Sequence, residues 1–131
     1  MTHQATCRCG QLSVQLHRDR PNSSICHCHD CQRRTGSVFG VQIRVDQSDV
    51  TIEGQSNQWC REGEQGDQIT FHFCPTCGAT VYWTHAALDG AIIIAVGAFG
   101  DATFPAPTFS VYEARQHPWV ILPESVTTHW D

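Results

Sequence analysis

Three short stretches decide how this chain folds: Cys7-Arg8-Cys9-Gly10, Cys26-His27-Cys28-His29-Asp30-Cys31 and Cys74-Pro75-Thr76-Cys77-Gly78. They contain seven of the eight cysteines. Spacings of the C-x-C and C-x-x-C type place thiolates close enough to share one ion, which is typical of zinc sites. Seven such ligands predict one closed four-cysteine site and one three-cysteine site with an open fourth position.

The composition predicts a single globular domain over residues 1–131, with 40% hydrophobic and 16% charged residues. A chain of this size can bury a core, but a metal would help to stabilise it. The sequence has no apolar run long enough for a membrane helix, and its polar start has no secretory h-region, so we expect a cytoplasmic protein. In that reducing compartment, clustered cysteines are metal ligands rather than disulfide partners.

The charge of the chain argues against a nucleic-acid partner. The formal net charge is −5, and thiolate-zinc sites would add further negative charge. The chain has no lysine and its arginines are scattered, whereas binding to a phosphate backbone needs a basic stripe.

The apolar pattern is mostly that of β-strands. Alternating apolar and polar residues predict strands at 12–16, 39–45, 50–52, 69–73, 81–83 and 109–112. The continuous apolar run 91–96 predicts a strand buried on both faces. One short helix is expected over Cys31–Arg34, with Asp30 as its N-cap and Gly36 as its stop. The polar segment 62–68 is predicted to be a loop.

The first and third clusters are predicted to form the closed site. Cys7 and Cys9 are two residues apart, so they point the same way on extended backbone. Cys74 and Cys77 have the spacing of a zinc knuckle, in which Gly78 can adopt positive φ. Together the two pairs would join distant parts of the chain through one ion.

The middle cluster is predicted to supply three ligands on one side of a second ion. Cys26 and Cys28 share a face by the same argument, and Cys31 comes within reach as a helical turn begins. His27 should point away and act in packing or behind the ligands, and His29 lies in the turn. Direct metal binding by either histidine is the less favoured interpretation.

Cys60, the eighth cysteine, has no cysteine close to it in the sequence. The favoured interpretation is an ordinary buried thiol. It could instead supply the fourth ligand of the second metal, which would close that site, or serve a redox or substrate-proximal role.

The order of these motifs resembles the glutathione-dependent formaldehyde-activating enzyme family. The resemblance rests on C-x-C-G, on C-x-C-x-x-C followed by the run Arg33 to Phe39, and on Phe73-Cys-x-x-Cys-Gly. It continues through Val96-Gly97-Ala98-Phe99 and from Pro107 to Trp119, and so covers nearly the whole chain.

This resemblance implies the Mss-like (β-tent) fold, mainly β, with small antiparallel sheets around zinc. It implies two Zn²⁺ per chain. The structural ion would be held by Cys7, Cys9, Cys74 and Cys77, and the catalytic ion by Cys26, Cys28 and Cys31. The activity implied is the condensation of formaldehyde with glutathione to S-hydroxymethylglutathione, which is carbon–sulfur lyase chemistry in the reverse sense.

An open zinc position suits that chemistry, because it can hold a substrate thiol as the thiolate that adds to a carbonyl carbon. Backbone N–H groups at Gly36 and Ser37 could contact the substrate or the developing alkoxide, although a simple helix stop explains them equally well. Arg33, Arg34 and Arg61 could bind the carboxylates of a thiol such as glutathione, but solvated surface charges are the favoured interpretation.

Other residues are expected to have unremarkable roles. Core packing is favoured over a place in the pocket wall for the aromatic residues Phe39, Trp83, Phe99 and Trp119. A surface position is favoured over acid–base catalysis for His85 and Asp89. The alternative function is a non-catalytic binding module of the same fold, in which the second site is closed or absent.

Overall fold

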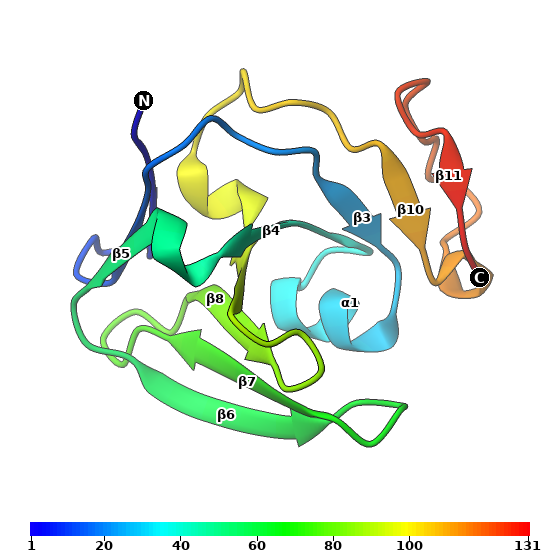
Figure 1. Ribbon diagram of the computed structural model, residues 1–131. Coiled ribbons are helices and arrows are strands. Elements are labelled where there is room, and N and C mark those ends of the chain that lie inside the picture. The colour runs from blue at the N-terminus through cyan, green and yellow to red at the C-terminus, as the bar shows by residue number, and fades with distance from the viewer.

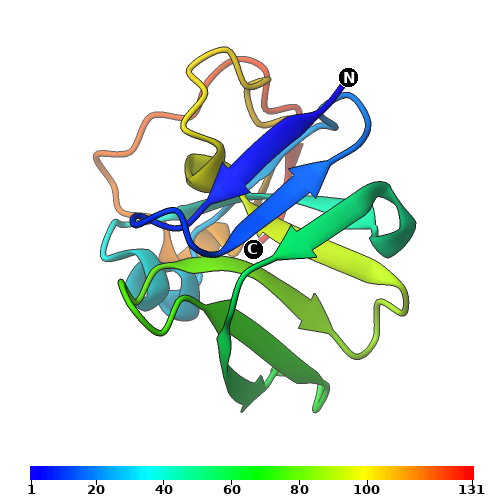
Figure 2. The ribbon, with the colours of Figure 1, turned by 90° about the vertical axis from the view of Figure 1, so that its left-hand side faces the viewer.

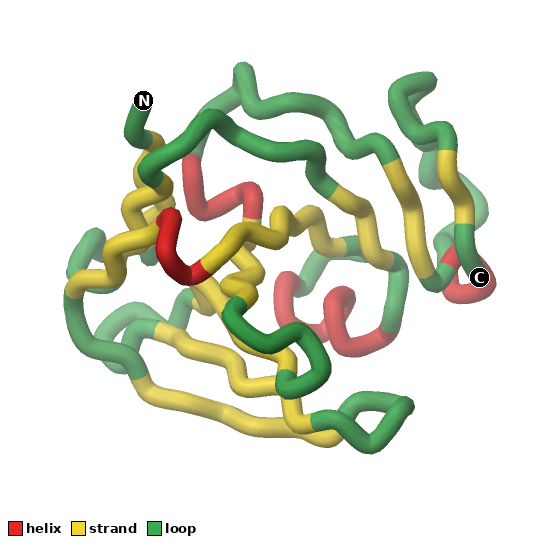
Figure 3. The backbone as a smooth tube through the Cα atoms, viewed as in Figure 1, coloured by secondary structure: helices red, strands yellow, loops and turns green.

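A computed structural model describes residues 1–131. The strands are β1 (His3–Thr6), β2 (Ser13–Leu16), β3 (Ser24–Cys26), β4 (Gly40–Asp46), β5 (Val50–Glu53), β6 (Asn57–Glu62), β7 (Gln68–Phe73), β8 (Thr80–His85), β9 (Ala91–Ala95), β10 (Phe109–Val111) and β11 (Thr128–His129). The helices are α1 (His29–Thr35) and the short 3₁₀ turns η1 (Gln47–Asp49), η2 (Val96–Phe99) and η3 (Glu113–Arg115). The fold is therefore mainly β with one α-helix, as expected (Figure 3). None of the helices has the length and apolar character needed to cross a membrane.

The strands form two sheets. The large one has the order β11-β10-β3-β4-β9-β8-β7-β6, and the small one has the order β1-β2-β5 (Figures 1 and 2). Most neighbours are antiparallel, but β10 runs parallel to both β3 and β11. The large sheet is therefore mixed rather than wholly antiparallel, because the C-terminal segment returns to pair beside β3.

The predicted central strand explains how the large sheet is packed on both faces. Ile92 and Ile94 of β9 belong to the main core, which also contains Val14 and Leu16 of the small sheet. Ile93, between them, points to the other face and packs in a smaller cluster of four buried residues, namely Ile69, Phe71, Trp83 and Ile93. Since side chains alternate along a strand, a continuous run of isoleucines is what a strand buried on both faces requires.

The expected strands are confirmed to within a few residues, and the structure adds β1, β3, β6 and β11. The helix also forms, but it begins earlier than predicted, with Cys28 rather than Asp30 as its N-cap. Phe99 packs against the main core as expected. Trp119 does not, because 68% of its surface is exposed.

Candidate metal centres and an adjoining cavity

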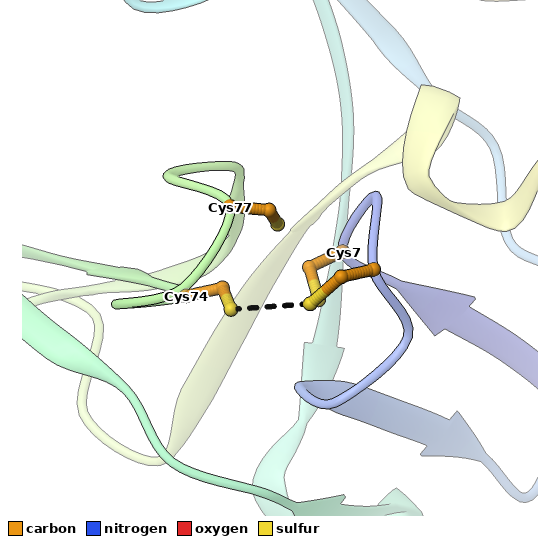
Figure 4. A group of neighbouring side chains, drawn as sticks. Cys7, Cys74 and Cys77 are labelled. Atoms are coloured by element: carbon orange, nitrogen blue, oxygen red, sulfur yellow. Dashed lines mark hydrogen bonds between the residues drawn. The ribbon is translucent and has the colours of Figure 1, made fainter.

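The first and third cysteine clusters come together as predicted. Cys7 and Cys9 lie in the turn after β1, and Cys74 and Cys77 lie in the turn between β7 and β8. All four sulfur atoms are within 4.8 Å of one another. Figure 4 shows the sulfurs of Cys7, Cys74 and Cys77 turned toward a common centre from these two separate loops.

The spacing of these sulfurs fits a four-coordinate metal. The Sγ atoms of Cys7 and Cys9 are 3.6 Å apart, and those of Cys9 and Cys74 are 3.7 Å apart. A tetrahedron with metal–sulfur bonds of about 2.3 Å has edges of about 3.8 Å. Backbone N–H groups also point at the sulfurs: Leu12 donates to Cys7 and Thr76 to Cys74, each at 3.3 Å. Such donors stabilise thiolates, so the four residues fit a closed metal site.

A side chain from the same loop as Cys7 and Cys9 supports this site. Gln11 donates from Nε2 to the Cys74 sulfur at 3.0 Å and to the Gln55 carbonyl oxygen at 2.6 Å. Its Oε1 accepts from the Gln55 N–H at 3.0 Å. The turn after β5 is therefore tied to the cysteine cluster. Gly54 in that turn has φ +95°, and a Cβ there would collide with the Gln11 backbone.

The middle cluster also assembles as predicted. Cys26 ends β3, Cys28 caps α1 and Cys31 lies in the first turn of that helix. Their sulfurs are within 4.8 Å of one another, and all three residues are buried. The Cys28 sulfur accepts the Cys31 N–H at 3.3 Å, so the atom that caps the helix is also a candidate metal ligand.

The thiols of the middle cluster differ in pKa. The pKa of Cys28 lies far below the usual thiol value. The main cause is that the thiols of Cys26 and Cys31 hydrogen-bond to its sulfur. The Cys31 N–H and the positive charge of Arg61 act in the same direction. The pKa of Cys26 is raised, because its proton is the one donated within the cluster and the group is buried. One thiolate is therefore already favoured here, which is the state a metal requires.

A cavity of about 370 Å³ opens directly onto this cluster, and all three cysteines line it. Phe71 of β7 and Trp83 of β8 form an aromatic wall. The other parts of the lining include Arg61 of β6, Tyr112 and Arg115 near η3, and Glu64 at the tip of the β6–β7 hairpin. The structure thus places three sulfurs at the inner end of a cavity and not within solid core.

Charged side chains from distant segments pair at the edges of this cavity. Arg61 Nε lies 3.1 Å from Asp30 Oδ2 and thereby joins β6 to the start of α1. Arg115 lies 3.2 Å from Glu64 and joins η3 to the tip of the β6–β7 hairpin. Tyr112 packs against the three cysteines and is the only residue other than glycine with positive φ, at 58°. Strained backbone of this kind occurs preferentially at functional sites.

Cys60 belongs to neither cluster. It is exposed on β6, and its thiol donates to Gln68 Oε1 at 2.8 Å, so the expectation of a buried thiol is wrong. Its neighbour Arg61 lines the cavity beside the middle cluster, whereas Cys60 does not. Because side chains alternate along a strand, Cys60 points to the opposite face. The fourth-ligand alternative has no support in this geometry.

The two histidines of the middle cluster lie outside the sulfur group. His27 is fully buried, and its Nε2 lies 2.9 Å from the Ser110 hydroxyl, so it packs behind the cluster as expected. Burial lowers its pKa. His29 is exposed and lines the cavity.

Gly36 and Ser37 form the end of α1. The Gly36 N–H bonds to the Gln32 carbonyl at 2.8 Å, and the Ser37 N–H bonds to the Thr35 hydroxyl at 3.0 Å. Neither residue lines the cavity beside the cysteines. The helix-stop interpretation therefore accounts for both, and contact with a substrate stays a prediction.

The structure also places the residues for which surface or core roles were favoured. Arg61 and His85 line the cavity, and Trp83 is both buried and part of the cavity wall. Asp89 is exposed and lies outside this lining.

No local sequence pattern indicates Tyr112, Arg115 or Glu64 as neighbours of the cysteines. Tyr112 was expected only as the end of a strand. Its place beside Cys26 depends on the parallel pairing of β10 with β3, which brings Val111 opposite Cys26. No local pattern encodes that pairing.

Comparison with known proteins identifies a similar fold and a family. A solved crystal structure of a protein from Rhodobacter sphaeroides has a similar fold, with a TM-score of 0.56 over 98% of this chain and 99% of that one, at 17% identity. Among curated proteins, none matches significantly. The model of the family described as glutathione-dependent formaldehyde-activating enzyme matches residues 2–115. This match covers most of the chain, including every cysteine of both clusters, and the chain therefore belongs to that family.

Proposed function

We propose that the protein is a zinc-dependent carbon–sulfur lyase that joins a glutathione-like thiol to formaldehyde or a related small carbonyl. One observation carries the proposal: Cys26, Cys28 and Cys31 form a three-sulfur cluster that faces a cavity and has no fourth protein ligand beside it. A structural metal site is normally closed by four protein ligands, whereas a catalytic site keeps one position open. The family membership supports the same class of reaction.

In this proposal, Cys7, Cys9, Cys74 and Cys77 would hold a structural zinc, and Cys26, Cys28 and Cys31 would hold a second zinc. The second ion, when bound, would keep a substrate thiol ionised near neutral pH. The new bond forms between the thiol sulfur and the carbonyl carbon. The π electron pair of the C=O bond moves to oxygen, which takes up a proton and so balances the proton that the thiol lost on ionisation.

The chain's own residues would supply an apolar wall and a positive charge beside the sulfurs. Phe71 and Trp83 give one side of the cavity an apolar surface. Arg61 places a positive charge beside the sulfurs and favours the thiolate state of Cys28. All eight cysteines are unpaired, which fits work in the reducing cytoplasm.

The test compares Cys31→Ser with Cys60→Ser. We expect two zinc ions per chain in the wild type and in Cys60→Ser, and one in Cys31→Ser. NMR exchange spectroscopy on a mixture of glutathione and formaldehyde should show faster formation of S-hydroxymethylglutathione with the wild type and with Cys60→Ser. Cys31→Ser should not accelerate it. Loss of a zinc in Cys60→Ser would mean a closed second site. A wild type with two zincs that does not accelerate exchange would favour the non-catalytic binding module.

A further inference from the structure

A polar side chain in the lining of the cysteine cavity lacks a partner in the protein. Gln42 of β4 belongs to this lining, together with all three cysteines of the middle cluster. Its Oε1 atom is buried and accepts no hydrogen bond. A buried acceptor without a donor is unfavourable, and most such atoms in folded proteins are paired. The missing donor is therefore expected from a molecule that enters the cavity.

The large sheet places Gln42 next to the sulfurs. Strands β3 and β4 are antiparallel, with Cys26 opposite Gly40 and Ser24 opposite Gln42. Opposite residues share a face of a sheet, and so do residues two apart, so Gln42 is a diagonal neighbour of Cys26 on the same face. Diagonal neighbours of this kind are about 7–8 Å apart, which is within reach of a long side chain.

The residues around Gln42 on this face are small. Gly40 lies two positions before it, Ser24 is opposite it on β3, and Ala95 is opposite it on β9. None of the three donates to Gln42 Oε1, since that atom has no hydrogen-bond partner. Small neighbours leave room for a ligand atom beside the carboxamide.

A charged donor on this side of the sheet, Arg34, is held elsewhere. Its Nη2 atom lies beside Gly40, 2.6 Å from the position that a Cβ would take there. The guanidinium lies over Trp83, with Cζ 4.3 Å from the ring centroid, so Arg34 is half-buried and not freely solvated. This cation–π contact keeps the guanidinium in place, and it makes no hydrogen bond to Gln42. The carboxamide oxygen is therefore left to a ligand.

We propose that Gln42 determines specificity for the carbonyl-derived hydroxyl group of the adduct, by accepting a hydrogen bond from it at Oε1. This role rests on the proposed function, in which addition turns a carbonyl oxygen, an acceptor only, into an O–H group that donates. The new hydroxyl is one carbon away from the sulfur. A sulfur at the three-cysteine cluster therefore brings this donor to the side of the cavity that carries Gln42. Gln42 then favours the adduct over a thioether without a hydroxyl.

The test compares two ligands that differ in this hydroxyl, S-hydroxymethylglutathione and S-methylglutathione. NMR follows their competition for the zinc-loaded protein, with the same excess of formaldehyde present throughout to keep the adduct intact. The wild type should bind the hydroxymethyl ligand at least about fivefold more tightly, because its hydroxyl satisfies a buried acceptor. Gln42→Met, which keeps the length of the side chain but has no acceptor oxygen, should bring the ratio of affinities close to one.

Two further variants show whether the acceptor oxygen itself is responsible. Gln42→Glu keeps an acceptor oxygen but loses the N–H donors, so the preference for the hydroxymethyl ligand should remain. Gln15→Met is the matched control, because Gln15 is also a half-buried glutamine on a strand but does not line the cavity. Its ratio of affinities should equal that of the wild type.

A ratio near one in the wild type would refute this role for Gln42, even if no variant folds. A ratio that Gln42→Met leaves unchanged would refute it too, because any loss of stability would then be purely structural. The proposed reaction is judged separately. A preference that depends on Gln42, in a protein that does not accelerate exchange, would support the role and reject the lyase. Normal acceleration without any preference would reject the role and leave the lyase.

Discussion

Cys28 combines two roles in a single sulfur atom. It caps α1 by accepting the Cys31 N–H, and it belongs to the three-sulfur cluster. A serine hydroxyl can take over the first role but is a poor substitute for the second, so the two can be separated experimentally.

We therefore predict that Cys28→Ser and Cys28→Ala both lose one metal ion per chain, while only the alanine variant also loses the helix cap. Cys28→Ala should be less stable than Cys28→Ser by about 1 kcal/mol, the usual contribution of an N-cap. Urea unfolding of the two variants, with metal content measured on the same samples, checks this. Equal stabilities would show that the sulfur does not stabilise the helix.

Gly54 should tolerate no side chain. It has φ +95°, and a methyl group there would meet the backbone of Gln11, which also donates to Cys74. Gly66, with φ +87°, is the matched control, because its nearest neighbour would be the flexible Glu62 side chain at 3.6 Å. Both alanine variants incur the strain of a left-handed backbone, of about 1–2 kcal/mol.

We predict that Gly54→Ala is less stable than Gly66→Ala by a further 1–3 kcal/mol or so, the usual effect of overpacking. The measurement is the free energy of unfolding in urea. Similar values for the two variants would mean that the Gln11 backbone moves aside without cost.

Among the elements, β6 is a strand that the local sequence does not predict. The cysteine groupings were predictable because ligand spacing is a local property of the chain. Residues Asn57–Glu62 have no apolar alternation, so β6 was not predicted, and with it the common face of Trp59 and Arg61 was missed. The strand forms because it pairs with β7 over six residues. Its formation therefore depends on β7 and not on its own sequence pattern.

The β7–β8 hairpin contains a titratable group that couples folding to pH. The ring of His72 stacks on Tyr82 with centroids 4.4 Å apart, and its Nδ1 lies 3.0 Å from the Ser56 hydroxyl. Burial lowers the pKa of His72. The unfolded chain therefore binds more protons at this position than the folded one, and stability is lost as the pH falls through the usual histidine range.

We predict that the wild type loses more stability than His72→Gln when the pH falls from about 7.5 to 5.5. Urea unfolding across this range at one zinc concentration measures the difference. Acid release of metal affects both proteins, so the comparison isolates the histidine. Parallel pH profiles would contradict the prediction.

For the whole molecule, the four-cysteine site brings together a loop of the small sheet and a turn of the large sheet. Cys7 and Cys9 follow the first strand of the small sheet, and Cys74 and Cys77 join two strands of the large one. A metal held by both pairs stabilises the folded state only, because the unfolded chain does not present the site.

We predict that Cys9→Ser lowers the free energy of unfolding by several kcal/mol, whereas Cys60→Ser changes it by less than about 0.5 kcal/mol. Both cysteines are exposed, so the comparison controls for the loss of a surface thiol. Thermal unfolding of the wild type and both variants, with zinc present, measures these changes in stability. Equal effects would show that the four-cysteine cluster does not hold the sheets together.

The two cysteine clusters differ in how far apart their members lie along the chain, and this bears on synthesis. The middle cluster is complete once residue 31 has left the ribosome. The other cluster joins residues far apart in the sequence, such as Cys9 and Cys74, which are 65 positions apart. Local contacts form early and distant ones late. A nascent chain therefore has all three cysteines of the middle cluster available before Cys74 and Cys77 of the other cluster have been made.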